Sequence, residues 1–182
     1  MKTAPNRYSS TLSHPPCEPG PVTKPSPPSP NGSHEPLVIV DAANVVGSVP
    51  DGWWRDRRRA TERLRDQLPG VAASGLPALA SVPDWATRGP VDLVLVVEGQ
   101  ARAVGEVPGV RVVRAERSGD DAIVDLVRAA ENRDRLVITA DRGLRDRVIA
   151  LGADVVGPHA VRRAQAGRPA QQSGNPPQST AP

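Results

Sequence analysis

The chain has 182 residues, 21 of them proline, and its 23 basic and 20 acidic side chains give a formal net charge of +3. The single cysteine excludes a disulfide framework and a cysteine zinc site. Two of the three histidines lie in the proline-rich first 36 residues, which leaves little for a histidine metal site or a Ser/His/Asp triad, so any catalysis must rely on carboxylates. The sequence has no run of about eighteen apolar residues and no apolar core of a secretory signal, so we expect a cytoplasmic protein without a membrane span.

Both ends of the chain have a composition typical of disordered segments. Residues 1–36 contain ten of the prolines and almost no branched aliphatic side chains, and residues 167–182 contain four more prolines. Such segments cannot bury enough apolar surface to offset the entropy lost on ordering. We therefore predict one folded domain over residues 37–166, flanked by a Pro-rich disordered tail and a second, shorter one.

Five runs rich in branched aliphatic residues divide the predicted domain. They are residues 37–41, 91–99, 110–116, 135–141 and, more weakly, 153–157. Runs that are apolar on both faces are typical of strands in a parallel sheet that is covered by helices.

The segments between these runs have helical periodicity. Residues 53–70 place Trp53, Ala60, Leu64 and Leu68 on one stripe, and this helix is expected to stop at Pro69-Gly70. Further helices are expected over 118–132, which opens with a Ser/Asp cap signal, over 141–152 and over 158–165, while 69–90 reads as a loop or a short, broken helix. Alternating strands and helices imply right-handed crossovers, and the predicted fold is α/β: a doubly wound, mostly parallel sheet of about five strands with helices on both faces.

Acidic residues follow several of the predicted strands. Asp41 ends the first run, Glu98 the second and Asp141 the fourth, while Asp120 and Asp121 open the helix after the third. Because the carboxyl ends of parallel strands meet at one edge of a sheet, four chain segments should deliver carboxylates to one place. A single Asp at such a position is as often a turn or helix cap, but the convergence favours a binding site.

A group of carboxylates in one cleft raises the pKa of its members unless a cation neutralises them. Mg²⁺ and Mn²⁺ prefer oxygen ligands and bind through a few carboxylates together with substrate phosphate. We therefore predict a Mg²⁺ or Mn²⁺ site at Asp41, Asp120, Asp121 and Asp141, with hydrolysis of phosphodiester bonds as its reaction.

Three polar residues near these acids leave two interpretations open. Asn44, three residues after Asp41, could bond the backbone of its own turn or could orient Asp41 and contact a phosphate. Thr139, two residues before Asp141, could contact substrate or the carboxylates, or could be a buried strand threonine. Asp125 on the predicted helix is better explained as a surface residue than as a support for the site.

Four motifs resemble a known family. They are VIVDAANVVG at 38–47, LVVEG at 95–99, GDDAIVDLV at 119–127 and VITADRGL at 137–144. Their order and spacing are similar to those of the PIN-like nuclease superfamily, and within it most similar to the NYN domain branch, over residues 37 to about 157. The resemblance implies a PIN-like fold and a Mg²⁺- or Mn²⁺-dependent endoribonuclease with an acidic cleft.

The resemblance also implies roles for individual residues. The positions that match the family's catalytic motifs are Asp41, Asn44, Glu98, Asp120 and Asp141. The sequence departs from the family at two positions, because Glu98 is one carbon longer than the usual aspartate and Gly143 stands where NYN proteins often carry a second aspartate. These departures keep two alternatives open: an RNA-binding or adaptor module with a decayed site, and a nucleoside triphosphate pyrophosphohydrolase.

RNA, single-stranded or structured, is the expected partner, and a homodimer or a ribosomal or RNA-processing partner is a further expectation. Once a metal neutralises the site acids, arginines could attract the phosphate backbone. Candidates are Arg55, Arg57, Arg58 and Arg59, with Arg142 and Arg102 near the cleft, although a solvated helix face explains the first four somewhat better. Because the sequence contains no Phe, three Trp and one Tyr, it argues against base-stacking platforms such as an RRM sheet or an OB groove.

Overall fold

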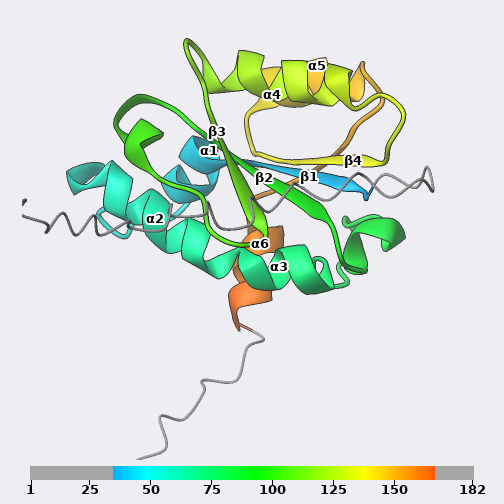
Figure 1. Ribbon diagram of the computed structural model, residues 1–182, viewed down its shortest axis with the longest axis horizontal. Coiled ribbons are helices and arrows are strands. Elements are labelled where there is room, and N and C mark those ends of the chain that lie inside the picture. The colour runs from blue at the N-terminus through cyan, green and yellow to red at the C-terminus, as the bar shows by residue number, and fades with distance from the viewer. Residues whose placement is uncertain (1–34, 167–182) are drawn as a thin grey trace, which may run out of the picture. The chain divides into compact units, whose positions relative to one another are not determined.

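A five-stranded sheet organises residues 35–166, the part of the chain that the computed structural model describes. All neighbouring strands are parallel and follow the order β3-β2-β1-β4-β5 (Figure 1). The strands are β1 (Leu37–Asp41), β2 (Asp92–Val97), β3 (Val110–Arg114), β4 (Arg135–Ile138) and β5 (Asp154–Val156). Apart from Glu35 and Pro36, the two predicted tails lie outside the described residues.

Helices cover both faces of this sheet, with α4 and α5 on one side and α2, α3 and α6 on the other (Figure 1). The α-helices are α1 (Ala42–Gly47), α2 (Arg57–Gln67), α3 (Pro69–Ser74), α4 (Gly119–Ala129), α5 (Arg142–Ile149) and α6 (His159–Ala166). Three short 3-10 helices are η1 (Trp53–Arg55), η2 (Asp84–Thr87) and η3 (Gly99–Ala103). The predicted fold class, a doubly wound α/β sheet, is confirmed.

No helix in the described part of the chain is both long and apolar enough to cross a bilayer.

The central strand β1 shows why the strands are apolar on both faces. Val38 and Val40 pack into the core beneath α2 and α3, whereas Leu37 and Ile39 pack into the core beneath α4 and α5. Successive strand side chains point to opposite faces, so a strand between two helical layers needs an apolar residue at every position. The first polar side chain of the strand, Asp41, therefore appears only at its carboxyl end.

The region between β1 and β2 differs most from the sequence-based expectation. The expected helix over 53–70 is divided into η1, α2 and α3, and Pro69 begins α3 instead of ending the helical region. Proline is tolerated there because the first turn of a helix does not use its backbone N–H groups. Residues 42–47, for which the sequence suggested at most a turn at Asn44, form the short helix α1, whose N-cap is Asp41.

Candidate active site

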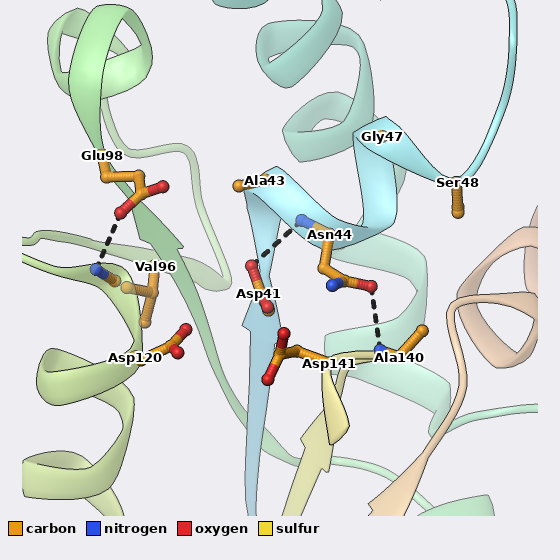
Figure 2. Close-up of a pocket in the computed structure, with 11 residues that line it drawn as sticks. Asp41, Ala43, Asn44, Gly47, Ser48, Val96, Glu98, Asp120, Ala140 and Asp141 are labelled. Atoms are coloured by element: carbon orange, nitrogen blue, oxygen red, sulfur yellow. Dashed lines mark hydrogen bonds between the residues drawn. The ribbon is translucent and has the colours of Figure 1, made fainter. Parts of the chain in front are cut away.

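An open pocket of about 470 Å³ lies at the carboxyl edge of the sheet (Figure 2). Its walls come from the ends of β1, β2 and β4, from α1 and from the start of α4. Four acidic residues from four separate chain segments line it: Asp41, Glu98, Asp120 and Asp141. The structure therefore brings together the four acids for which the sequence predicted catalytic roles.

Asp41 is the most buried of the four acids, with an exposed fraction of 9%. Its Oδ1 accepts a hydrogen bond from the backbone N–H of Asn44 at 3.1 Å, and its Oδ2 accepts one from the Thr139 hydroxyl at 2.9 Å. Burial raises the pKa of Asp41, and the negative charges of Asp120 and Glu98 act in the same direction, while the two hydrogen bonds oppose the rise. Asp41 is thus fixed in position, and its burial and the neighbouring charges disfavour its ionised form.

Thr139 connects Asp41 to the start of α5. Its hydroxyl donates to Asp41 and accepts a hydrogen bond from the backbone N–H of Asp141 at 3.1 Å. The residue is 0% exposed, so its hydroxyl cannot meet a substrate in the pocket as arranged. The two interpretations of Thr139 are therefore combined: it is a buried threonine, and it holds a site carboxylate.

Asn44 lines the pocket and joins two strand ends. Its backbone N–H donates to Asp41, and its side-chain Oδ1 accepts a hydrogen bond from the backbone N–H of Ala140 at 2.8 Å (Figure 2). One side of α1 is thereby attached to the segment between β4 and α5. This arrangement places Asn44 where it orients Asp41, and its exposure at the pocket leaves it accessible to a bound molecule.

Asp120 and Asp141 face one another across the pocket, with Asp41 beside them (Figure 2). Asp141 caps α5, because its Oδ1 accepts a hydrogen bond from the backbone N–H of Leu144 at 2.8 Å. Partial burial raises the pKa of Asp120, the charge of Asp141 raises it further, and Arg147 opposes the rise. Capping and site formation are therefore not alternatives at Asp141, which caps a helix and lines the pocket.

Glu98 contacts the start of α4 on one side of the pocket. Its Oε2 accepts a hydrogen bond from the backbone N–H of Gly119 at 2.8 Å, while Ser118, the N-cap by position, makes no side-chain cap bond (Figure 2). The Ser/Asp cap signal of the sequence thus placed the helix start correctly but not the capping group. One oxygen of the Glu98 carboxylate is therefore already hydrogen-bonded to the backbone at the start of α4.

Two of the acids considered in the sequence lie elsewhere. Asp121, a predicted metal ligand, does not line the pocket, and its Oδ1 pairs with the guanidinium of Arg147 at 2.6 Å on the exposed surface. Asp125 pairs with Arg128 at 3.2 Å, also on the surface. Consecutive helix residues point about 100° apart, and here Asp120 lines the pocket while Asp121 is directed toward Arg147.

None of the arginines in the described residues lines the pocket. Arg58 pairs with Glu62 on α2 at 2.9 Å, and Arg102 donates to the backbone carbonyl of Glu116 at 2.6 Å. Arg142 is exposed and directly follows Asp141 in the chain. The predicted substrate-binding arginines therefore lie outside the pocket, and Arg142 is the one adjacent in the chain to a pocket acid.

Sequence reasoning missed the part of the pocket that α1 supplies. Ala43, Gly47 and Ser48 line it together with Asn44. The spacing of Asp41 and Asn44 contained the signal, because an N-cap carboxylate bonds the backbone N–H two or three residues further on. Read in that way, the motif predicts a helix directly after the first strand.

The donors in the pocket are carboxylate oxygens, which suit Mg²⁺ or Mn²⁺ and not zinc, whose usual ligands include nitrogen or sulfur. Within residues 35–166, no three acidic, histidine or cysteine side chains lie close enough together to hold an ion in the observed arrangement. Mg²⁺ often binds through only one or two carboxylates and keeps several waters. Burial and the charges of neighbouring acids raise the pKa of Asp41 and of Asp120, and a bound cation would favour the ionised form of both carboxyls. The residues present thus fit a hydrated divalent cation and not a closed metal cage.

Comparisons with known proteins identify the fold. Two crystal structures of Rae1 (YacP) from Bacillus subtilis resemble the chain, both with a TM-score of 0.54. One structure is 16% identical and the match covers 71% of this chain and 74% of that chain; the other, a tryptophan-to-leucine variant, is 15% identical over 72% and 76%. No family model matches the sequence, and no curated protein is similar to it in sequence. At this level of identity the likeness shows a shared fold.

Proposed function

We propose that the protein is a Mg²⁺- or Mn²⁺-dependent endoribonuclease that hydrolyses phosphodiester bonds of RNA in the acidic pocket. The observation that carries the proposal is the meeting of Asp41, Glu98, Asp120 and Asp141, from four chain segments, at the carboxyl edge of a parallel sheet. Ligands of open α/β sheets bind at this edge. The fold shared with Rae1 and the four motifs that resemble the PIN-like superfamily, NYN branch, give independent support.

The four acids have different tasks in this proposal. Asp120 and Asp141 face the open pocket and would hold the cation together with water. Asp41, fixed by Asn44 and Thr139, would add a further negative charge to the same pocket. A bound divalent cation supplies a Lewis acid that activates water and stabilises charge on the attacked phosphate. Glu98 sets the position of α4, and with it that of Asp120.

Cleavage of an end-labelled single-stranded RNA in the presence of Mn²⁺ tests this function. Asp120→Asn and Asp141→Asn should each lower the cleavage rate by about 100-fold or more, since each removes a charge aimed at the cation. Asp125→Asn is the matched control, because it makes the same change on α4 outside the pocket and should leave the rate unchanged. A chelator should abolish cleavage by the unaltered protein.

Two other outcomes would overturn the assignment. Salt-sensitive retention of RNA without metal-stimulated cleavage would identify an RNA-binding module, the alternative that is favoured by the lack of a three-ligand cluster in residues 35–166. Release of pyrophosphate from nucleoside triphosphates faster than RNA cleavage would identify a pyrophosphohydrolase. The residues that line the pocket in the described part of the chain include no aromatic ring for a nucleotide base.

A further inference from the structure

Two tryptophans and several arginines gather in the segment between α1 and α2. Trp54, in η1, is the most exposed large apolar side chain in the described part of the chain, at 55%. Trp53 packs edge-on against it, with ring centroids 6.1 Å apart and the ring planes at 83°. Such a T-shaped contact holds an aromatic ring in one orientation and leaves the outer ring open to solvent.

The same segment carries an excess of positive charge. Residues 51–65 contain six arginines and three acids. The Arg57 guanidinium lies 5.0 Å from the centroid of the Trp53 ring. Among the described residues, no carboxylate forms a salt bridge with Arg55, Arg57 or Arg59. Their charges are therefore available to an anionic partner.

This surface adjoins the acidic pocket. Gly47 lines the pocket, and a methyl group placed on its Cα would lie 3.7 Å from Cζ2 of Trp53. The segment is also fixed locally, because Asp51 accepts a hydrogen bond from the backbone N–H of Trp53 at 3.1 Å and Asp56 caps α2. Trp53 thus lies between Gly47 at the edge of the pocket and the exposed ring of Trp54.

We propose that Trp54, supported by Trp53 and flanked by Arg55, Arg57 and Arg59, binds single-stranded RNA next to the pocket. An unpaired base would stack on Trp54, and the arginines would contact the neighbouring phosphates. Duplex RNA keeps its bases stacked inside the helix, so the platform selects single strands. This inference rests on the proposed function for its substrate and adds the surface that recognises it. The low aromatic content of the sequence hid this surface, because two of its three tryptophans lie at one site.

Fluorescence anisotropy of a labelled, unpaired RNA of about ten nucleotides measures the platform directly. A chelator is present throughout, so that no cleavage occurs. Trp54→Ala should weaken binding about fivefold to 100-fold, and Trp54→Phe should restore most of the affinity because it keeps an aromatic ring. Ile149→Ala removes a comparably exposed apolar side chain, 53% exposed, from α5 on the other face of the sheet and should bind like the unaltered protein.

Salt dependence and duplex RNA separate stacking from charge. Arg55→Gln combined with Arg59→Gln should reduce the slope of log Kd against log salt by about 0.7 for each phosphate of a single strand that the arginines no longer neutralise. Trp54→Ala should leave this slope, and the affinity for a duplex of the same sequence, nearly unchanged. Unaltered single-strand affinity in Trp54→Ala, or an equal loss on duplex RNA, would overturn the proposal and assign the exposed tryptophan to another type of partner.

The binding test and the cleavage test fail independently. If the unaltered protein cleaves no RNA but the Trp54→Ala variant binds single-stranded RNA more weakly than it does, the nuclease assignment is wrong and the proposed binding surface is supported. If metal-dependent cleavage occurs but Trp54→Ala changes neither the affinity nor the KM for an unpaired substrate, the platform is wrong and the nuclease assignment stands.

Discussion

At the scale of single residues, the Thr139 hydroxyl connects two of the acids that line the pocket. One buried hydroxyl bonds both the carboxylate of Asp41 and the backbone N–H of Asp141, so it fixes two pocket acids relative to each other. A buried hydroxyl of this kind is costly to remove, because the Asp41 carboxylate and the backbone N–H of Asp141 each lose a hydrogen-bond partner.

Thr139→Val keeps the shape of the side chain and removes the hydroxyl. We expect a loss of about 1–3 kcal/mol in the free energy of unfolding, measured by urea denaturation. The pKa of Asp41 should rise further, since one of the hydrogen bonds that oppose its rise is lost. Thr139→Ser keeps the hydroxyl and is the control. Equal stability of the valine and serine variants would contradict the role assigned to the hydroxyl.

Asp120 should make the protein less stable at neutral pH than an uncharged residue would. Because partial burial and Asp141 raise its pKa, the folded state binds the proton more tightly than the unfolded state does. Stability is therefore lost as the pH rises from the ordinary value of 3.8 through the raised pKa of the folded state. Asp120→Asn avoids this loss.

The measurement for Asp120→Asn is the melting temperature as a function of pH. We expect a gain of about 1–3 °C at neutral pH, kept small by the partial exposure of the carboxylate, and no gain below about pH 3.8. Asp125→Asn, an exposed acid on the same helix, should change the free energy of unfolding by less than about 0.5 kcal/mol. A gain for Asp120→Asn that is independent of pH would show that its cause is not electrostatic.

At the scale of the elements, the sequence predicts the strands well because burial on both faces leaves a strong signal. It predicts helices α2, α4 and α5 from their apolar stripes, which the structure buries. It misses α1, whose six residues are too few for periodicity and which depends on the carboxylate of Asp41 as its cap. It also assigns the cap of α4 to Ser118. The group that accepts the hydrogen bond from the backbone N–H of Gly119 is Glu98, 21 residues earlier than Gly119, and no local sequence pattern indicates a partner so far away.

The cap of α4 can be tested by comparing Glu98→Ala with Ser118→Ala. Removing the Glu98 carboxylate should cost about 1 kcal/mol in the free energy of unfolding, because the backbone N–H of Gly119 loses its acceptor. Ser118→Ala should cost less than about 0.5 kcal/mol, since its side chain makes no cap bond. Glu98→Gln keeps an acceptor and should fall between. A larger loss for Ser118→Ala in chemical denaturation would restore the local cap.

At the scale of the whole molecule, the topology assembles the pocket. With β1 in the centre and β2 and β4 on either side, residues at or shortly after the carboxyl ends of these strands reach the same edge. The meeting of Asp41, Glu98 and Asp141 was therefore predictable from three apolar runs followed by acids. The pairing of Asp121 with Arg147 was not, because it depends on how α4 and α5 pack together.

Metal binding should be visible in the stability of the whole fold. If Mn²⁺ binds the folded pocket, it should stabilise the protein by about 2.7 kcal/mol at a concentration 100 times its Kd. The quantity to compare is the rise in melting temperature on adding Mn²⁺. We expect this rise to be lost in Asp120→Asn and Asp141→Asn and kept in Asp125→Asn. In the unaltered protein, the rise in melting temperature on adding Mn²⁺ should become smaller as the pH falls, because protons then compete with the metal for the carboxylates. The pKa values of Asp41 and Asp120 are raised, so this competition should begin at a higher pH than for ordinary carboxylates. Equal rises in all variants would place the bound metal outside the pocket.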